Sequence, residues 1–221
     1  MKKYIAEKVK NTTRSIRFGN IRVEEVDPLP AGFNLQAILK TIEDKFPPHF
    51  LHGVKMIEIG HKKEFEERDI NAFYKSGTFY ITNKQDNPED LLDDIVHEFA
   101  HHMETQFAEQ IYSDTNIIAE FLEKRQQLLY ELRSEGYWTE KYDFRNLKYD
   151  VAFDKFLYKY VGNNMLKMIS TGLFIRPYAA VSLREYFATG FESYYLGKAD
   201  ELYKISPALY MKIKELHLIR K

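Results

Sequence analysis

Apolar and polar positions follow two different repeats along the chain, which predict strands early and helices late. Residues 21–26, 54–60 and 77–83 are short runs rich in β-branched and aromatic side chains, which indicates strands. Between the first two runs, residues 33–46 carry apolar side chains at helical spacing and stop at two consecutive prolines. The first half is therefore expected to combine a small sheet with helices.

The clearest start signal of any helix lies after the third strand. Asn87 suits the N-cap, Pro88 suits the first helical position, and Glu89 and Asp90 fall in the first turn, where the helix dipole favours acids. Apolar residues follow at helical spacing and predict a core-facing surface, formed by Leu91, Leu92, Ile95, Val96, Phe99 and Met103.

Helical spacing dominates the second half. It predicts helices over about 116–134, 150–161, 164–171 and 182–195, and a last one from Ser206-Pro207 onward. Strands followed by helices predict the α+β fold class. We expect one domain over residues 1–221, with an N-terminal α/β lobe over about 18–110 and a helical C-terminal lobe over about 111–221.

The composition is consistent with a packed core and excludes several classes of functional site. The 221 residues are 44% hydrophobic and 15% aromatic, and a formal charge of −1 gives no electrostatic case for binding nucleic acid. The absence of cysteine excludes disulfides, thiolate ligands and thiol nucleophiles. With no signal peptide and no long apolar run, we expect no membrane span and a cytoplasmic protein as written, although secretion or association with a phage by another route stays open.

Residues 97–101, His-Glu-Phe-Ala-His, have the pattern H-E-x-x-H on the helix that begins near Asn87. Four helical residues turn only about 40° beyond a full turn, so His97 and His101 project from one face. Neutral imidazoles bind Zn²⁺ and leave a position for water. Glu98 lies beside the first histidine, where it would accept a proton from that water.

A simpler interpretation is a charged amphipathic helix with surplus histidine. Glu98 and His102 are also four residues apart and would then pair as ions. His102 is five residues from His97 and points elsewhere, so we exclude it as a ligand. The strand, short polar loop and capped helix around the motif favour the zinc interpretation.

A catalytic zinc site needs a third protein ligand. The remaining histidine downstream, His217, lies near the C-terminus and is a weak candidate, which leaves a carboxylate on a later helix. Spacing alone does not choose among the available acids, which are Glu109, Glu120, Glu123, Glu131, Glu135, Glu185 and Glu192.

Residues 176–213 add three short motifs in a fixed order. Tyr178 comes first, then Glu185 opens the sequence Glu-Tyr-Phe-Ala with Phe191 after it, and Pro207 and Tyr210 follow. With H-E-x-x-H upstream, this order resembles the zinc-peptidase domain of anthrax lethal factor and of its relatives, including the secreted Pro-Pro endopeptidases.

The resemblance implies a zincin-like α+β fold and one Zn²⁺ ion held by His97, His101 and Glu185. It further implies that Glu98 is the catalytic base and that Tyr178 hydrogen-bonds the oxyanion or the metal-bound water. The family often has an acid where this chain has Thr189, and the interval before Glu185 is long, which suggests an inserted helical region over about 115–165 that shapes substrate access or binds a partner.

Two residues of the predicted 182–195 helix have competing interpretations. Ser182 and Glu185 also fit a capping box, in which Glu185 turns back to the Ser182 amide instead of binding metal. Glu192 lies on the same helix face as Glu185 and is either a hydrogen-bond partner for a ligand histidine or a solvated acid.

The sequence thus predicts a zinc-dependent endopeptidase whose partner is a peptide or protein substrate, with no role for nucleic acid or membrane. An extended substrate would align along residues 77–83, taken as an edge strand. The alternatives are a non-catalytic zincin-fold protein for binding or assembly, such as a phage- or toxin-associated one, and a helical structural protein with a chance motif. The sequence predicts no oligomeric state.

Overall fold

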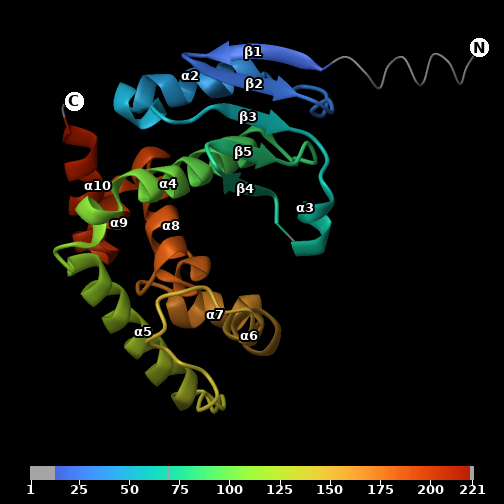
Figure 1. Ribbon diagram of the computed structural model, residues 1–221. Helices are drawn as coiled ribbons and strands as arrows, with labels where there is room; N and C mark the ends of the chain where they lie inside the picture. Colours follow the sequence, from blue (N-terminus) through green and yellow to red (C-terminus); the bar gives the residue numbers. More distant parts are fainter. Residues whose placement is uncertain (1–12, 69, 220–221) are drawn as a thin grey trace, which may run out of the picture. The chain divides into compact units, whose positions relative to one another are not determined.

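The computed structural model describes residues 13–68 and 70–219 (Figure 1). The chain divides into two compact units, one ending at His102 and the other beginning at Met103. This division falls inside helix α4 (Pro88–Tyr112), earlier than the change near residue 110 that the sequence suggested. The units are described in turn.

The N-terminal unit is built on one mixed sheet of five strands in the order β1-β2-β3-β5-β4. The strands are β1 (Arg14–Phe18), β2 (Ile21–Glu25), β3 (Met56–Ile59), β4 (Ala72–Lys75) and β5 (Thr78–Ile81). The central pairs β2–β3 and β3–β5 are parallel, and the outer pairs β1–β2 and β4–β5 are antiparallel. The three predicted strands are confirmed, and with the helices described below they confirm the α+β class.

One face of the sheet is buried. Val23, Ile57 and Phe79 stand opposite one another on β2, β3 and β5, and none of the three is exposed to solvent. Positions in between, such as Glu24, Glu58 and Tyr80, are only half-buried. This alternation is the period-two pattern expected of strands that have one face against a core.

The prediction that residues 77–83 form an edge strand was wrong. β5 lies between β3 and β4, so the edges of the sheet are β1 and β4. Ser76 and Gly77 both have positive φ, 52° and 88°, as the two-residue turns of tight hairpins require, and this turn folds β4 back onto β5. β4 has only four residues, and its Ser-Gly turn was the signal in the sequence for it.

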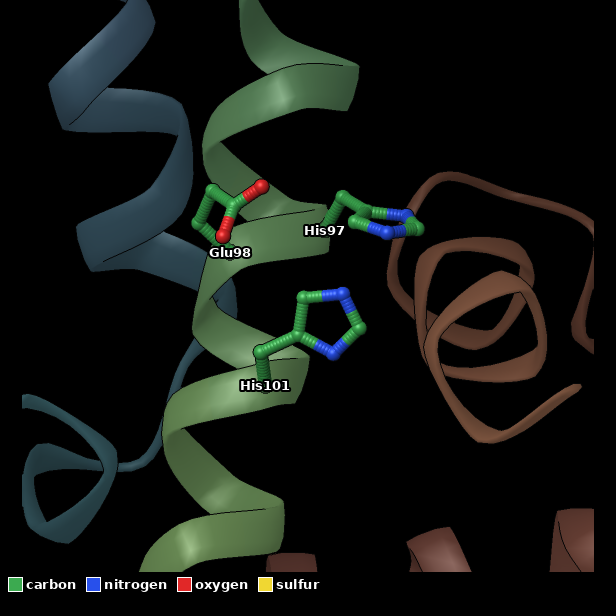
Figure 2. A group of neighbouring side chains, drawn as sticks. All are labelled: His97, Glu98 and His101. Atoms are coloured by element: carbon green, nitrogen blue, oxygen red, sulfur yellow. The ribbon is translucent and has the colours of Figure 1, made fainter. Parts of the chain in front are cut away.

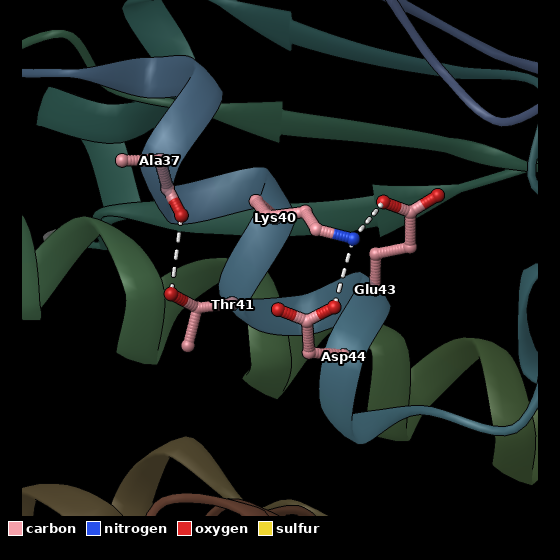
Figure 3. A network of polar contacts seen from close by, with 5 residues as sticks. All are labelled: Ala37, Lys40, Thr41, Glu43 and Asp44. Atoms are coloured by element: carbon pink, nitrogen blue, oxygen red, sulfur yellow. Dashed lines mark hydrogen bonds and ion pairs between the residues drawn. The ribbon is translucent and has the colours of Figure 1, made fainter.

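Helices α2 (Leu35–Lys45) and α3 (Lys63–Arg68) and the 3₁₀ turn η1 (Pro48–Leu51) complete the connections of this unit. Within the predicted 33–46 helix, Asn34 caps α2 by accepting a hydrogen bond from the Ala37 amide at 3.1 Å. On the solvent side, Lys40 pairs with Glu43 at 3.1 Å and with Asp44 at 2.8 Å (Figure 3). Exposed pairs of this kind contribute little, so α2 is held mainly by its buried apolar face.

The C-terminal unit is helical among its described residues. Its elements are α5 (Asn116–Ser134), α6 (Val151–Lys155), the π-helix η2 (Phe156–Gly162), α7 (Asn163–Ser170), the 3₁₀ turn η3 (Pro177–Ala180), α8 (Leu183–Tyr195), α9 (Ala199–Ile205) and α10 (Pro207–Leu218). Every predicted helix is confirmed, with 150–161 seen as α6 running into η2. Helix α9 was not predicted from the sequence.

Arg125 of α5 lies at the centre of this unit, with only 1% of its surface exposed. Its guanidinium donates hydrogen bonds to four main-chain carbonyls, those of Asp143, Phe144, Ala180 and Val181. Its charged group also lies 4.0 Å from the centre of the Phe153 ring. One side chain thus joins α5 to the loop after it and to η3.

Helices α8 and α10 approach closely at Gly190. A Cβ atom at this position would lie 2.3 Å from Leu209 Cδ2 and 2.8 Å from Leu209 Cγ. We expect Gly190→Ala to destabilise the C-terminal unit by about 1–3 kcal/mol through this overlap, although alanine is otherwise the better helix former. Urea unfolding measures the change, and the double variant Gly190→Ala/Leu209→Ala should regain part of the loss. A Gly190→Ala variant as stable as the parent would contradict the close contact.

Among the described residues, no helix combines the length and the apolar character that crossing a bilayer requires.

Candidate metal centre

The start of α4 is fixed to the end of β5 by polar contacts. Asn87 accepts a hydrogen bond from the Asp90 amide at 2.9 Å, which confirms it as the N-cap. The buried Gln85 amide donates to the Thr82 carbonyl at 3.1 Å and to Asp94 Oδ2 at 2.8 Å. These contacts set where the helix begins, and therefore which of its residues face the core.

Phe99 anchors α4 in the core of the N-terminal unit. Its ring centre lies 4.7 Å from that of Phe79 on β5 and 5.1 Å from that of Phe46, both at nearly perpendicular angles. Phe18 lies 6.5 Å away in the same arrangement. Because these contacts bury the side of α4 that bears Phe99, they fix the rotation of the helix and the direction in which the intervening residues project.

His97, Glu98 and His101 form a cluster that fits a metal ion. One possible ligand atom from each residue lies within 4.8 Å of those of the other two. The two imidazole rings project from the same side of α4, with 4.6 Å between their centres and an angle of 88° between their planes (Figure 2). Glu98 and His101 are buried, and His97 is partly exposed. The structure thus brings these three predicted residues together.

The chemistry of the cluster suits a divalent transition metal. Neutral imidazole nitrogens are preferred ligands of Zn²⁺, and four-residue helical spacing brings two of them to one ion. The neighbouring carboxylate belongs to the same group of possible ligand atoms, either as a ligand or as a proton acceptor. The cluster could hold a metal ion, and its residues do not by themselves fix which one.

His102 makes contacts of its own in the N-terminal unit. Its Nε2 lies 2.8 Å from the His52 carbonyl, and its Nδ1 lies 3.3 Å from the Tyr74 hydroxyl. A carbonyl only accepts, so Nε2 carries the proton and Nδ1 accepts from Tyr74 in the neutral ring. Burial lowers the pKa of His102, which favours this neutral form over the ion pair with Glu98 considered above.

Glu185 lies in the first turn of α8, in the C-terminal unit, and is 9% exposed. Its amide donates to the Ser182 hydroxyl at 3.2 Å, so the serine half of the predicted capping box is present. This bond uses the backbone amide of Glu185 and not its carboxylate, so the glutamate half of the box is not part of it. Thr189, where the related peptidases often have an acid, instead donates its hydroxyl to the Glu185 carbonyl at 2.9 Å.

Two charged residues near Glu185 were missed by the sequence analysis. Glu104 accepts a hydrogen bond from the Tyr112 hydroxyl at 2.5 Å and lies 3.6 Å from Arg184 Nε. Burial raises the pKa of Glu104, and the charge of Glu185 adds to that increase. The only signal in the sequence was that Arg184 directly precedes the candidate ligand.

Tyr178 lies in η3, in the same unit as Glu185. Burial and, after it, the negative charge of Glu185 raise the pKa of the Tyr178 hydroxyl above its ordinary value. The hydroxyl therefore keeps its proton and can act as a hydrogen-bond donor near neutral pH. The ring of Tyr158, from the π-helix η2, lies 6.2 Å from that of Tyr178 between centres.

One of the two interpretations of Glu192, that it is a solvated acid, was wrong. Its side chain is 3% exposed, and its Oε2 lies 2.7 Å from Arg176 Nη1. The alternative, a contact with a ligand histidine, stays a prediction. This pairing was not predicted, because the two residues are distant along the chain and lie on different elements.

The other candidate ligands either make hydrogen bonds within the C-terminal unit or are exposed to solvent. Glu120 accepts hydrogen bonds from the amides of Ala208 and Leu209 and from the Tyr186 hydroxyl, so it caps α10. His217 Nδ1 lies 2.9 Å from the Tyr195 hydroxyl. The remaining acids among the candidates are exposed, namely Glu109, Glu123, Glu131 and Glu135.

Comparisons of the chain with protein-family models, with curated proteins and with solved structures find no match.

Proposed function

We propose that this protein is a zinc-dependent endopeptidase with a zincin-like fold, similar to the peptidase domain of anthrax lethal factor. The observation that carries the proposal is the cluster of His97, Glu98 and His101 on α4, a helix that follows a mixed sheet and is fixed against its buried face. The order of motifs in residues 176–213 supports the same assignment and makes Glu185 the third ligand.

The chain's own residues have defined tasks in this proposal. His97, His101 and Glu185 hold the ion, which when bound supplies a Lewis acid that polarises the scissile carbonyl and lowers the pKa of water. Glu98 accepts a proton from the attacking water and delivers it to the leaving amine. Tyr178 donates a hydrogen bond to the oxyanion that forms on the substrate carbonyl. The substrate is a peptide or protein.

Zinc content tests the ligand set directly. We expect the purified protein to hold about one Zn²⁺ per chain, and His97→Ala, His101→Ala and Glu185→Gln each to lose it, because removing one of three ligands opens the site. Ser182→Ala is the matched control for Glu185→Gln. It removes the N-cap of α8, costs about 1 kcal/mol of stability and should retain the metal.

The measurements are elemental analysis after gel filtration and thermal unfolding with and without chelator. A Glu185→Gln variant that retains stoichiometric zinc would remove Glu185 from the site. Zinc that raises the unfolding temperature without any cleavage of a peptide library would favour a non-catalytic binding protein instead.

A further inference from the structure

The 3₁₀ turn that carries Tyr178 is held at both ends by arginine side chains. Before the turn, Arg176 pairs with Glu192 of α8 at 2.7 Å. At its last residue, Ala180, the carbonyl accepts a hydrogen bond of 2.5 Å from Arg125 of α5. Two separate elements thus restrain a turn of only four residues, more than a surface connection needs.

The pair of Arg176 and Glu192 is asymmetric. The side chain of Glu192 is 3% exposed, whereas that of Arg176 is 38% exposed. A buried carboxylate is costly unless an opposite charge and hydrogen bonds compensate it, so Glu192 strongly favours conformations that keep Arg176 in place. Arg176 comes two residues before Tyr178, so holding its side chain restrains the backbone that leads into the turn.

Helix α8 carries both Glu192 and the proposed ligand Glu185. Glu192 and Glu185 are seven residues apart on this helix, which places them on one face two turns apart. A contact that fixes Arg176 to Glu192 therefore fixes the start of η3 along the same face that bears Glu185. The contribution of Glu185 to the electrostatic surroundings of Tyr178 agrees with this proximity.

We propose that the Arg176–Glu192 ion pair is a positioning device that sets Tyr178 relative to Glu185, and that it affects peptide hydrolysis through Tyr178. The consequence for hydrolysis rests on the proposed function, whereas the effect on the turn does not. Neither residue is assigned a contact with substrate. Misplacing a catalytic group by about 1 Å can lower a rate by about 100-fold, which is why such a device would be needed.

Amide hydrogen exchange tests the effect on the turn. The Ala179 and Val181 amides donate within η3 to the carbonyls of Arg176 and Tyr178, both at 3.1 Å, and report its opening. We expect Glu192→Gln to raise exchange in residues 176–182 by about tenfold or more, and Arg176→Lys to raise it less, because lysine keeps the charge.

Asp114→Asn is the matched control. It removes the same charge from another ion pair of this unit, in which Lys212 is 9% exposed, Asp114 is 37% exposed and the distance is 2.5 Å. It should leave exchange in residues 176–182 unchanged. Circular dichroism establishes whether each variant is folded. If Glu192→Gln does not fold, Arg176→Lys provides the comparison.

A double-mutant cycle tests the route to catalysis. We expect Glu192→Gln to lower kcat by about tenfold with little change in KM, and to have less than about a twofold effect in a Tyr178→Phe background, because the group it positions is then absent. A residue with a merely structural role would lower activity equally in both backgrounds.

Unchanged exchange in residues 176–182 for both Glu192→Gln and Arg176→Lys would overturn the proposal, as would losses of kcat that multiply in the double variant. If the unsubstituted protein cleaves no peptide, the proposed function fails, and the exchange comparison still decides whether the ion pair positions the turn.

Discussion

Glu98→Gln is expected to abolish peptide cleavage while zinc remains bound. The substitution keeps the size of the side chain and both histidines, but an amide cannot accept the proton that the attacking water must lose. General-base catalysis is worth roughly 10²–10⁴-fold, so kcat/KM on a peptide found in a library screen should fall by about that factor. Zinc content and the unfolding temperature should stay close to those of the parent.

The control for Glu98→Gln lies on the same helix. Glu109 is an exposed glutamate of α4, and Glu109→Gln makes the identical chemical change away from the cluster. It should leave kcat/KM within about twofold, as expected of a surface substitution far from the chemistry. If Glu98→Gln cleaves peptide at the rate of the parent, the proposed mechanism is contradicted, even if zinc is present.

Arg125→Met should cost about 3–5 kcal/mol of the free energy of unfolding. Methionine fills much of the same volume, but four main-chain carbonyls lose their donor, and three of them belong to the buried residues Phe144, Ala180 and Val181. The contact of the charged group with the Phe153 ring is lost as well. Urea unfolding followed by circular dichroism measures the loss.

Two comparisons separate the hydrogen bonds of Arg125 from its charge. Arg125→Lys keeps a positive charge, but an ammonium group has fewer donors than the planar guanidinium. It should therefore recover only part of the lost free energy of unfolding. Arg133 lies on the same helix, is exposed and makes a hydrogen bond to the Thr139 hydroxyl at 2.9 Å, and Arg133→Met should cost less than about 1 kcal/mol. A loss below about 1 kcal/mol for Arg125→Met would show that water reaches the four carbonyls.

The two kinds of experiment address different parts of the chain. The Arg125 variants measure how firmly α5 is joined to η3, and thus the support of the turn that bears Tyr178. The Glu98 variants measure chemistry at α4. If Arg125→Lys folds but exchanges more rapidly in residues 176–182, both ends of that turn contribute to holding Tyr178.

The sequence by itself determined what depends on neighbours a few residues away. The cap at Asn87 and the helices α2, α4 and α5 follow from local hydrogen bonding and apolar spacing, which one segment carries within itself. The convergence of His97 and His101 is local in the same sense, because four helical residues always bring two side chains to one face.

Only the tertiary structure decided the features that join distant segments. The place of β5 inside the sheet depends on the pairing of β4, a strand of four residues whose stability comes from its partner rather than from its own composition. The carbonyls that Arg125 binds, and the arginine that meets Glu192, are likewise distant in sequence. From the sequence alone, a charged side chain is expected to be exposed to solvent. It is buried only where the packing of distant segments brings a partner to it.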